Sequence, residues 1–244
     1  MADQFSIYVG GVGSAAAVTS LGAASAVLEK NQQPFLLIDC GPGVVEHYRE
    51  RYQCLPGAVF ITHLHLDHIG GLETLFFSRR FSAQTDLIKL YVPASLVALL
   101  CERVANYPGT LAEGGENFWD VFQLIPVLEN FFVQGIHLQA IAVRHHAPKS
   151  AFGVYLPGYC FFSGDTRPVP EILSHVIDQR AVIFHDCGLH SNPSHTGLED
   201  LLREYSPELR ARIYAYHYLN EEQRQKIEAA GIKTLRAGSC LTLG

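Results

Sequence analysis

The sequence predicts a mixed α/β protein in which two β-sheets pack together and helices cover their outer faces. Strand-like and helix-like segments are mixed along all 244 residues, and hairpin-like strand pairs predominate. A composition of 48% apolar and 17% charged residues is typical of a globular chain with a full hydrophobic core. Because no linker or internal repeat divides the sequence, we expect one domain over residues 1–244.

The first half of the chain begins with a strand and a glycine turn. Residues 5–9 alternate in strand fashion and end at Gly10 to Gly13, which predicts a strand followed by a tight turn. Residues 94–104 place Leu96, Leu100 and Val104 on one helical face. Apolar runs between turn residues predict strands at residues 25–28, 35–38, 59–62 and 88–92, and a short helix is expected at residues 44–52.

Residues 105–130 separate the two halves of the chain and predict neither helix nor strand. This segment contains the bulky Phe118, Trp119 and Phe122, for which we favour core packing. Alternation predicts a strand at residues 136–143, and Pro157-Gly158 predicts a hairpin between strands at residues 152–156 and 159–162. Start signals predict a helix over residues 170–179 and three late helices that begin near Thr196, Ser206 and Asn220. The remaining strands are expected at residues 181–184, 213–216 and 233–235.

Charge and hydropathy exclude several classes of protein. No window of about 18 uncharged apolar residues is present, so we expect neither a transmembrane helix nor a membrane partner. A net charge of −6 provides no broad basic footprint for a nucleic acid. The first residues carry an acid and no base, and the six cysteines form no C-x-x-C pair, so we expect a cytoplasmic protein with reduced, mostly buried thiols.

The most informative segment follows the strand at residues 59–62. It reads His63-x-His65-x-Asp67-His68 and places four metal-competent side chains within six positions. In an extended chain residues 63, 65 and 67 point the same way, and His68 joins them only if the chain turns. Imidazole and carboxylate ligands suit zinc, iron and manganese, so the segment predicts a metal site rather than a solvated surface loop.

This motif resembles the metal motif of the metallo-β-lactamase superfamily. Further landmarks of that family occur in the same order, namely Asp39-Cys40-Gly41 after an early strand, Ser163-Gly164-Asp165 after a later one, and His217 at the end of a strand. The resemblance spans roughly residues 5 to 220. It implies a four-layer αββα sandwich and a two-metal hydrolase.

The resemblance also implies a ligand set. His63, His65 and His145 would hold one metal, Asp67, His68 and His217 would hold the second, and Asp165 would bridge them. The cofactors are then two divalent ions, in the first instance Zn²⁺ with Mn²⁺ or Fe²⁺ as alternatives, and the nucleophile is a hydroxide shared between them. Asp67 is also expected to be catalytic. His146 stands beside His145, and we prefer His145 as the ligand and assign His146 a supporting or structural role.

A second feature resembles the ribonuclease Z-like and phosphodiesterase branch of the superfamily. The run His185-Asp186-Cys187 followed by Ser194-His195-Thr196 is similar to the segment in which an acid orients a proton-donating histidine. Asp186 would then orient His195, and His195 would protonate the departing oxygen. Such a general acid assists the departure of a phosphodiester's leaving group.

The resemblance therefore implies a phosphodiesterase that acts on a small or nucleotide phosphodiester. A tRNA substrate is less favoured, because the basic arm typical of ribonuclease Z enzymes is missing between Gly71 and Ile136. The alternatives are a lactone or thioester hydrolase, a ribonuclease Z-type endonuclease, and a non-catalytic metal-binding protein. A dinucleotide-binding interpretation of Gly11-x-Gly13-x-x-Ala16 is disfavoured because no amphipathic helix follows it. The sequence leaves a homodimer open.

Overall fold

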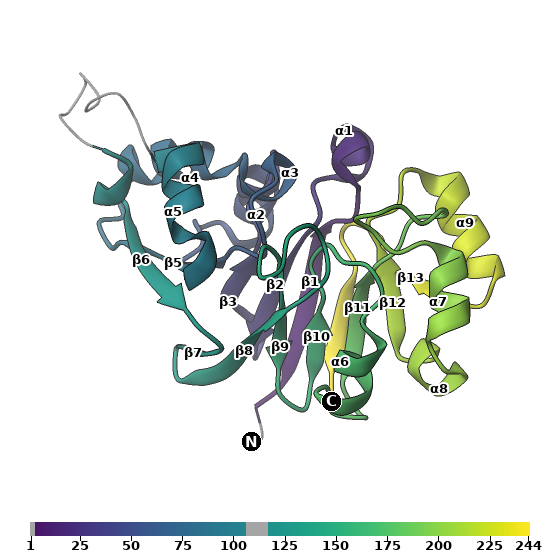
Figure 1. Cartoon of the computed structure of the whole chain (residues 1–244). Coiled ribbons are helices and arrows are strands. Elements are labelled where there is room, and N and C mark those ends of the chain that lie inside the picture. Colours follow the sequence, from purple (N-terminus) through teal and green to yellow (C-terminus); the bar gives the residue numbers. More distant parts are fainter. Residues whose placement is uncertain (1–2, 106–116) are drawn as a thin grey trace.

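The computed structural model describes residues 3–105 and 117–244, and within them the strands form two mixed sheets of seven strands each (Figure 1). The first sheet has the strand order β14-β1-β2-β3-β4-β5-β6, and the second has the order β13-β12-β11-β10-β9-β8-β7. The two-sheet architecture that the sequence predicts is confirmed.

The first sheet is built mainly from the N-terminal half, and β14 joins β1 at its edge in antiparallel register with Phe5 opposite Leu243. The segment from β3 to β6 is parallel. Its strands are β1 (Phe5–Gly11), β2 (Ser25–Lys30), β3 (Gln33–Ile38), β4 (Ala58–Phe60), β5 (Ile88–Pro93), β6 (Phe122–Val127) and β14 (Cys240–Leu243).

The second sheet is built from the C-terminal half. Strands β10, β11, β12 and β13 are parallel, while β9 is antiparallel to both of its neighbours. Its strands are β7 (Asn130–Val133), β8 (Ile136–Ala142), β9 (Phe152–Leu156), β10 (Cys160–Phe162), β11 (Val182–Asp186), β12 (Ile213–Tyr216) and β13 (Lys233–Thr234).

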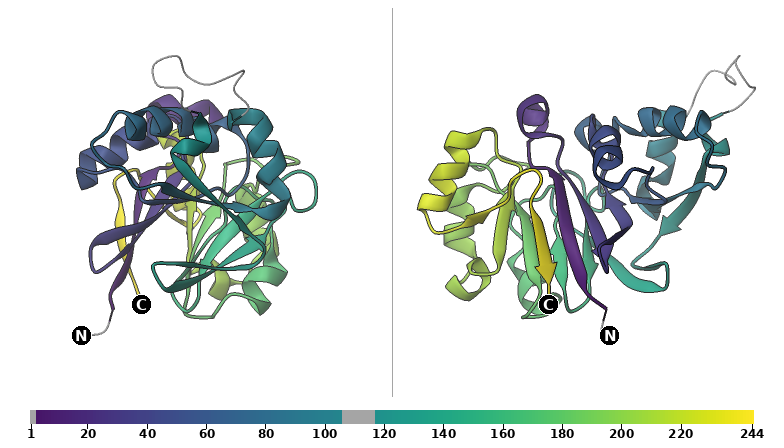
Figure 2. Two further views of the ribbon diagram at one scale, coloured as in Figure 1. Left: turned by 90° about the vertical axis from the view of Figure 1, so that its left-hand side faces the viewer. Right: turned by 180° about the vertical axis from the view of Figure 1, so that it is seen from behind.

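Helices cover the two outer faces, with the first group on the left of Figure 1 and most of the second group on the right. The first group is α2 (Val44–Tyr52), α3 (Leu66–Ile69), α4 (Leu72–Arg80) and α5 (Val97–Leu100). The second is α6 (Pro170–His175), α7 (Leu198–Glu204), α8 (Pro207–Arg210) and α9 (Glu221–Ala229). The short α1 (Val18–Leu21) lies at one end of the sheets, at the top of Figure 1 and of the right-hand view in Figure 2.

The core lies between the sheets, where their inner faces interdigitate. Phe60 of β4 stacks on Phe131 of β7 with ring centroids 5.3 Å apart, and Phe5 of β1 contacts Tyr159 at 4.6 Å. Burial of each such ring contributes roughly 1.5–3 kcal/mol to folding. Phe118 and Phe122 are also buried, which confirms core packing for that aromatic group.

Some elements differ from the sequence-based expectations. The helix expected over residues 170–179 ends at His175, because the chain turns at Val176 to reach β11. The helix expected over residues 94–104 is a succession of 3₁₀, α and π turns. Helix α4 and strand β14 were not expected, and the unassigned segment 105–130 contains β6, while its residues 106–116 lie outside the described part.

The lengths of the helices and the burial of the cysteines can be compared with the sequence-based expectations. Every helix in residues 3–105 and 117–244 is too short or too polar to span a bilayer. All six cysteines are free thiols, but only Cys40, Cys160 and Cys187 are buried, so the expectation of mostly buried thiols holds for half of them.

Strand direction positions the functional side chains at one edge of both sheets. Because β10, β11 and β12 are parallel, their carboxyl ends lie together, and β8 runs the same way since β9 is antiparallel to both β8 and β10. Strands β3 and β4 of the first sheet are parallel as well. Loops that follow parallel strands at their carboxyl ends are the usual place for a binding site.

A close approach of two chain segments sets the loop after β4 against the end of β3. Gly41 lies so near the carbonyl of Asp67 that an added Cβ would overlap that oxygen. A Cβ added at Gly71 would overlap the carbonyl oxygen of Gly41 in the same way. Backbone hydrogen bonds hold the contact, with Cys40 N donating to His68 O at 2.7 Å and Gly71 N donating to Cys40 O at 2.8 Å. Only glycine permits this approach.

We expect Gly41→Ala to lower the free energy of unfolding by about 1–3 kcal/mol, because the new methyl group must displace the backbone of Asp67. Gly57→Ala is the matched control, since its Cβ would meet open space and should change stability by less than about 0.5 kcal/mol. Urea unfolding of both variants measures the difference. Equal stabilities would show that the contact at Gly41 imposes no constraint.

Candidate metal centre

The histidine-rich segment after β4 brings its four side chains to one place because the chain turns at Leu66. His65 is extended, and α3 begins at Leu66 directly after it. The chain therefore turns within the motif, as the inclusion of His68 requires. Asp67 and His68 share this first helical turn, which directs both toward the site that His63 and His65 face.

The remaining side chains come from loops after strands of the second sheet. His145 follows β8, Asp165 follows β10, and His217 follows β12 directly. His217 has φ +73°, a left-handed conformation that is strained for this residue. Such strain is typical of functional sites that the surrounding structure holds in place.

Seven side chains then form two groups that share Asp165. Ligand-type atoms of each group lie within 4.8 Å of one another, and both groups consist of the residues implied by the family resemblance. The first group is His63, His65, His145 and Asp165, and the second is Asp67, His68, Asp165 and His217. A third group of metal-competent side chains, Asp165, Asp186, His195 and His217, shares two residues with the second.

Two histidines of the site are held through their Nδ1 atoms by Asp39 and Thr62. His68 Nδ1 donates to Asp39 Oδ2 at 2.7 Å, and Thr62 Oγ1 donates to the same oxygen at 2.7 Å. Because the Thr62 hydroxyl proton is used in this way, its oxygen accepts from His63 Nδ1 at 3.1 Å. Both rings therefore carry their proton on Nδ1 and leave Nε2 free, which is the arrangement usual for metal-bound histidines.

Two further histidines follow the same rule from the second sheet. His145 Nδ1 donates to the carbonyl of Ser194 at 2.8 Å, and His217 Nδ1 lies 3.4 Å from Asp186 Oδ1. The Nε2 of His217 lies 3.4 Å from Asp165 Oδ2, and that of His145 lies 3.9 Å from the same oxygen. A hydrogen bond therefore holds His145 from behind, Asp186 lies behind His217 without such a bond, and the other nitrogen of each ring faces the shared carboxylate.

The free atoms lack hydrogen-bond partners among the described residues. His63 Nε2, His68 Nε2, His217 Nε2 and one oxygen each of Asp165 and Asp186 are buried and unpaired. An unpaired buried polar atom is costly, so a cluster of them indicates a group that the protein binds. A tetrahedral zinc ion with bonds of about 2.1 Å separates its ligands by roughly 3.4 Å. The 3.3 Å between His68 Nε2 and Asp165 Oδ1 and the 3.5 Å between His63 Nε2 and Asp165 Oδ2 match this spacing.

The buried carboxylates also shift the pKa values of the histidines around them. Burial lowers the pKa of His63 well below its ordinary value. Burial would also lower the pKa of His68, but the charges of Asp165 and Asp39 outweigh it and raise that pKa well above its usual range. Burial is likewise outweighed at His217, where Asp165 and Asp186 raise the pKa to about 10. The buried carboxylates therefore require positive charge, which protons or divalent ions can supply.

His195 lies beside this centre and contacts Asp186, as the sequence predicts for the pair. Its Nδ1 donates to Asp186 Oδ2 at 2.8 Å, and Thr166 N donates to the same oxygen at 2.9 Å. The ring stacks on His217 with centroids 4.8 Å apart. Burial would lower the pKa of His195, but the hydrogen bond and charge of Asp186 outweigh it and raise that pKa. The histidine is thus oriented and favoured in its protonated form.

A cavity of about 340 Å³ opens onto the centre. Its lining includes His65, Asp67, Asp165, His195 and His217. Asp186, which the sequence analysis pairs with His195, also lines the cavity. The remaining lining was not identified from the sequence, because it comes from chain segments without a chemical motif: Ser14, Ala15, Ala16, Gly188, Leu189, His190, Asn192, Leu219 and Gln223.

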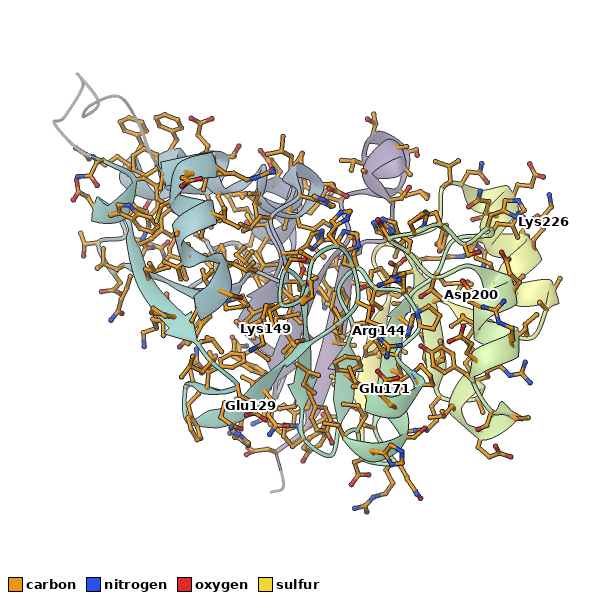
Figure 3. All side chains as sticks on the ribbon, in the orientation of Figure 1. Glu129, Arg144, Lys149, Glu171, Asp200 and Lys226 are labelled. Atoms are coloured by element: carbon orange, nitrogen blue, oxygen red, sulfur yellow. The ribbon has the colours of Figure 1, made fainter. Side chains whose placement is uncertain are left out.

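The structure also separates His145 from His146. His145 is buried in the first group, and His146 is exposed and lies outside both groups. Arg144, labelled in Figure 3, pairs with Glu171 of α6 at 2.7 Å and fixes the segment that carries both histidines. Sequence reasoning missed Thr62 and the Ser194 carbonyl as supports, since nothing local in the sequence marks them.

Known proteins are similar to this chain in sequence and in fold. The model of the anti-Pycsar protein Apyc1 family matches residues 5–240. An anti-Pycsar protein Apyc1 of Paenibacillus sp. (strain J14) is 30% identical over 219 residues, which cover 85% of this chain and 87% of that protein.

Solved structures agree with the fold. A diphosphatase from the PhnP family matches with a TM-score of 0.76 at 17% identity and 97% coverage of both chains. The metallo-β-lactamase fold protein YhfI from Bacillus subtilis matches with a TM-score of 0.75 at 12% identity, covering 98% of this chain and 99% of that one. These matches confirm the metallo-β-lactamase fold, and the chain belongs to the anti-Pycsar protein Apyc1 family.

Proposed function

We propose that the protein is a two-metal phosphodiesterase that hydrolyses a small nucleotide phosphodiester. The observation that carries the proposal is the pair of groups sharing Asp165, whose buried Nε2 and carboxylate atoms lack partners among the described residues, beside an oriented histidine. His63, His65, His145 and Asp165 would hold one ion, and Asp67, His68, His217 and Asp165 would hold the other. Bound divalent ions there would neutralise phosphate charge and lower the pKa of a water molecule.

The chain's own residues hold and orient this centre. Asp39 and Thr62 fix the rings of His68 and His63 through their Nδ1 atoms, so neither ring has to reorient when substrate enters. Asp67 is only slightly exposed and lies 3.5 Å from His68 Nε2, at the border between the buried groups and the cavity. Asp67 is therefore placed to hold a metal and to face the reacting phosphate.

His195 is placed to donate a proton to the leaving oxygen. Asp186 accepts from its Nδ1, which leaves Nε2 as the proton-bearing atom available to the cavity that His195 lines. The alkoxide of a sugar is a poor leaving group, so its departure benefits from a positioned acid. Asp186 also lies near His217, so one carboxylate orients both the acid and a ligand.

The cavity favours a small substrate over a polynucleotide. None of the described residues that line it is Lys or Arg, and the chain carries a net charge of −6. A long polyanion is normally held by basic side chains along its backbone. A single phosphodiester needs only the cations of the centre, and a cyclic mononucleotide is therefore the first compound to test.

A lactone or thioester hydrolase is the second candidate on this fold. Acyl transfer requires polarisation of one carbonyl. His195 has no clear task in that reaction, and its hydrogen bond to Asp186 therefore favours the phosphodiester. Turnover of a panel of cyclic nucleotides, tRNA precursors, lactones and thioesters separates the candidates, and exclusive lactone or thioester turnover would overturn the proposal.

Loss of the shared carboxylate should remove metal and activity together. We expect Asp165→Ala to lose most of its bound metal and to reduce kcat by more than about 100-fold, beyond the 10–100-fold typical of residues that only support a ligand. Elemental analysis and phosphodiester turnover of the purified protein measure both effects. Asp178→Ala, a change at a more exposed aspartate paired with Arg180, is the control. Full turnover by a metal-free Asp165→Ala protein would contradict the mechanism.

The role of His195 depends on the leaving group. We expect His195→Ala to lower kcat on a cyclic mononucleotide by ~10²–10⁴-fold and to lower it less than ~10-fold on bis(p-nitrophenyl) phosphate, whose phenolate departs without protonation. Metal content should stay unchanged. The control is His175→Ala at the exposed end of α6. Equal losses on both substrates, or no loss on either, would remove the proton-donor role.

A further inference from the structure

His146 contacts the back of a histidine in the first metal group. Its Nε2 lies 3.0 Å from His65 Nε2, and its Nδ1 lies 3.3 Å from Ser194 Oγ. His146 is exposed and belongs to neither group of metal-competent side chains. Its contacts therefore reach the centre only through His65.

The contacts of His65 determine where its proton lies. Its Nδ1 is 3.2 Å from His145 Nε2, and both atoms face the first group. A nitrogen that holds a cation cannot also carry a proton, so the proton of a neutral His65 ring belongs on Nε2. His65 Nε2 then donates to His146 Nε2, and His146 in turn donates from Nδ1 to the hydroxyl of Ser194.

Ser194 thus supports two histidines of the same group. Its carbonyl accepts from His145 Nδ1 at 2.8 Å, and its hydroxyl accepts from His146, which accepts from His65. Asn192 Oδ1 in turn accepts from the backbone of Ser194 at 2.8 Å and of His195 at 3.0 Å. The turn that carries His195 is therefore attached to the metal group at the preceding residue.

We propose that His146 is a positioning residue that holds His65 in its metal-binding tautomer and orientation, with Ser194 as its anchor. The inference rests on the proposed metal centre. It explains why two adjacent histidines follow β8, since His145 faces the first group and His146 supports another member of it from outside. Partners that hold the second nitrogen of a metal-bound histidine typically contribute 10–100-fold to metal affinity.

The test is Co²⁺ binding to the purified apoprotein, followed by its visible absorption bands and by calorimetry, with no substrate present. We expect His146→Ala to weaken binding at one of the two sites by ~10–100-fold and to shift the Co²⁺ bands, while the other site keeps its affinity. His146→Gln places an amide oxygen where Nε2 was and should restore most of the affinity. His146→Asn reaches toward Ser194 but not His65, and should resemble His146→Ala.

The control is His47→Ala on the exposed face of α2, which should bind Co²⁺ as the unsubstituted protein does. Ser194→Ala keeps its carbonyl and loses only the hydroxyl, so we expect a weaker effect in the same direction. Wild-type Co²⁺ affinity and bands in His146→Ala would overturn the positioning role, as would a His146→Gln protein as impaired as His146→Ala. Failure of the unsubstituted protein to bind Co²⁺ would instead overturn the metal-dependent function.

Discussion

The site depends on a cluster of buried polar atoms, in which several imidazole nitrogens and carboxylate oxygens have no hydrogen-bond partners among the described residues. The Nδ1 protons of His63 and His68 already form hydrogen bonds with Thr62 and Asp39. When these rings are neutral, their Nε2 atoms therefore have no proton to donate to the buried carboxylates. A fold that removes such atoms from water needs a ligand to compensate for the lost hydration. Divalent cations held by the two groups would supply that compensation, which is why we base the proposed function on the site rather than on the sheets.

The backbone around the centre shows how tightly this arrangement is imposed. Asp39 and His217 both adopt left-handed conformations, at φ +62° and +73°, and both touch the site. Gly41 and Gly71 let the loop after β4 rest directly on the end of β3. Strain and close packing of this kind persist only where many other contacts hold the chain in place. The parallel strands of both sheets supply those contacts.

The two-sheet architecture could be predicted from the sequence, because alternation and turn residues are local signals, whereas the full ligand set is what the family resemblance implies. His63, His65, Asp67 and His68 stand together in one segment, while His145, Asp165 and His217 are assigned from the order of the family's landmarks. Supports such as the Ser194 carbonyl could not be predicted, since they depend on which loops meet in space. Helix α4 was missed because it starts at Leu72 after Gly71, which offers no side-chain cap.

The central claim is tested most directly by anomalous diffraction at the zinc absorption edge from crystals of the zinc-loaded protein. The account predicts two peaks, each about 2.0–2.2 Å from an oxygen of Asp165, one among His63, His65 and His145 and the other among Asp67, His68 and His217. Absence of any peak within these groups, with their side chains turned toward one another or toward solvent, would contradict it.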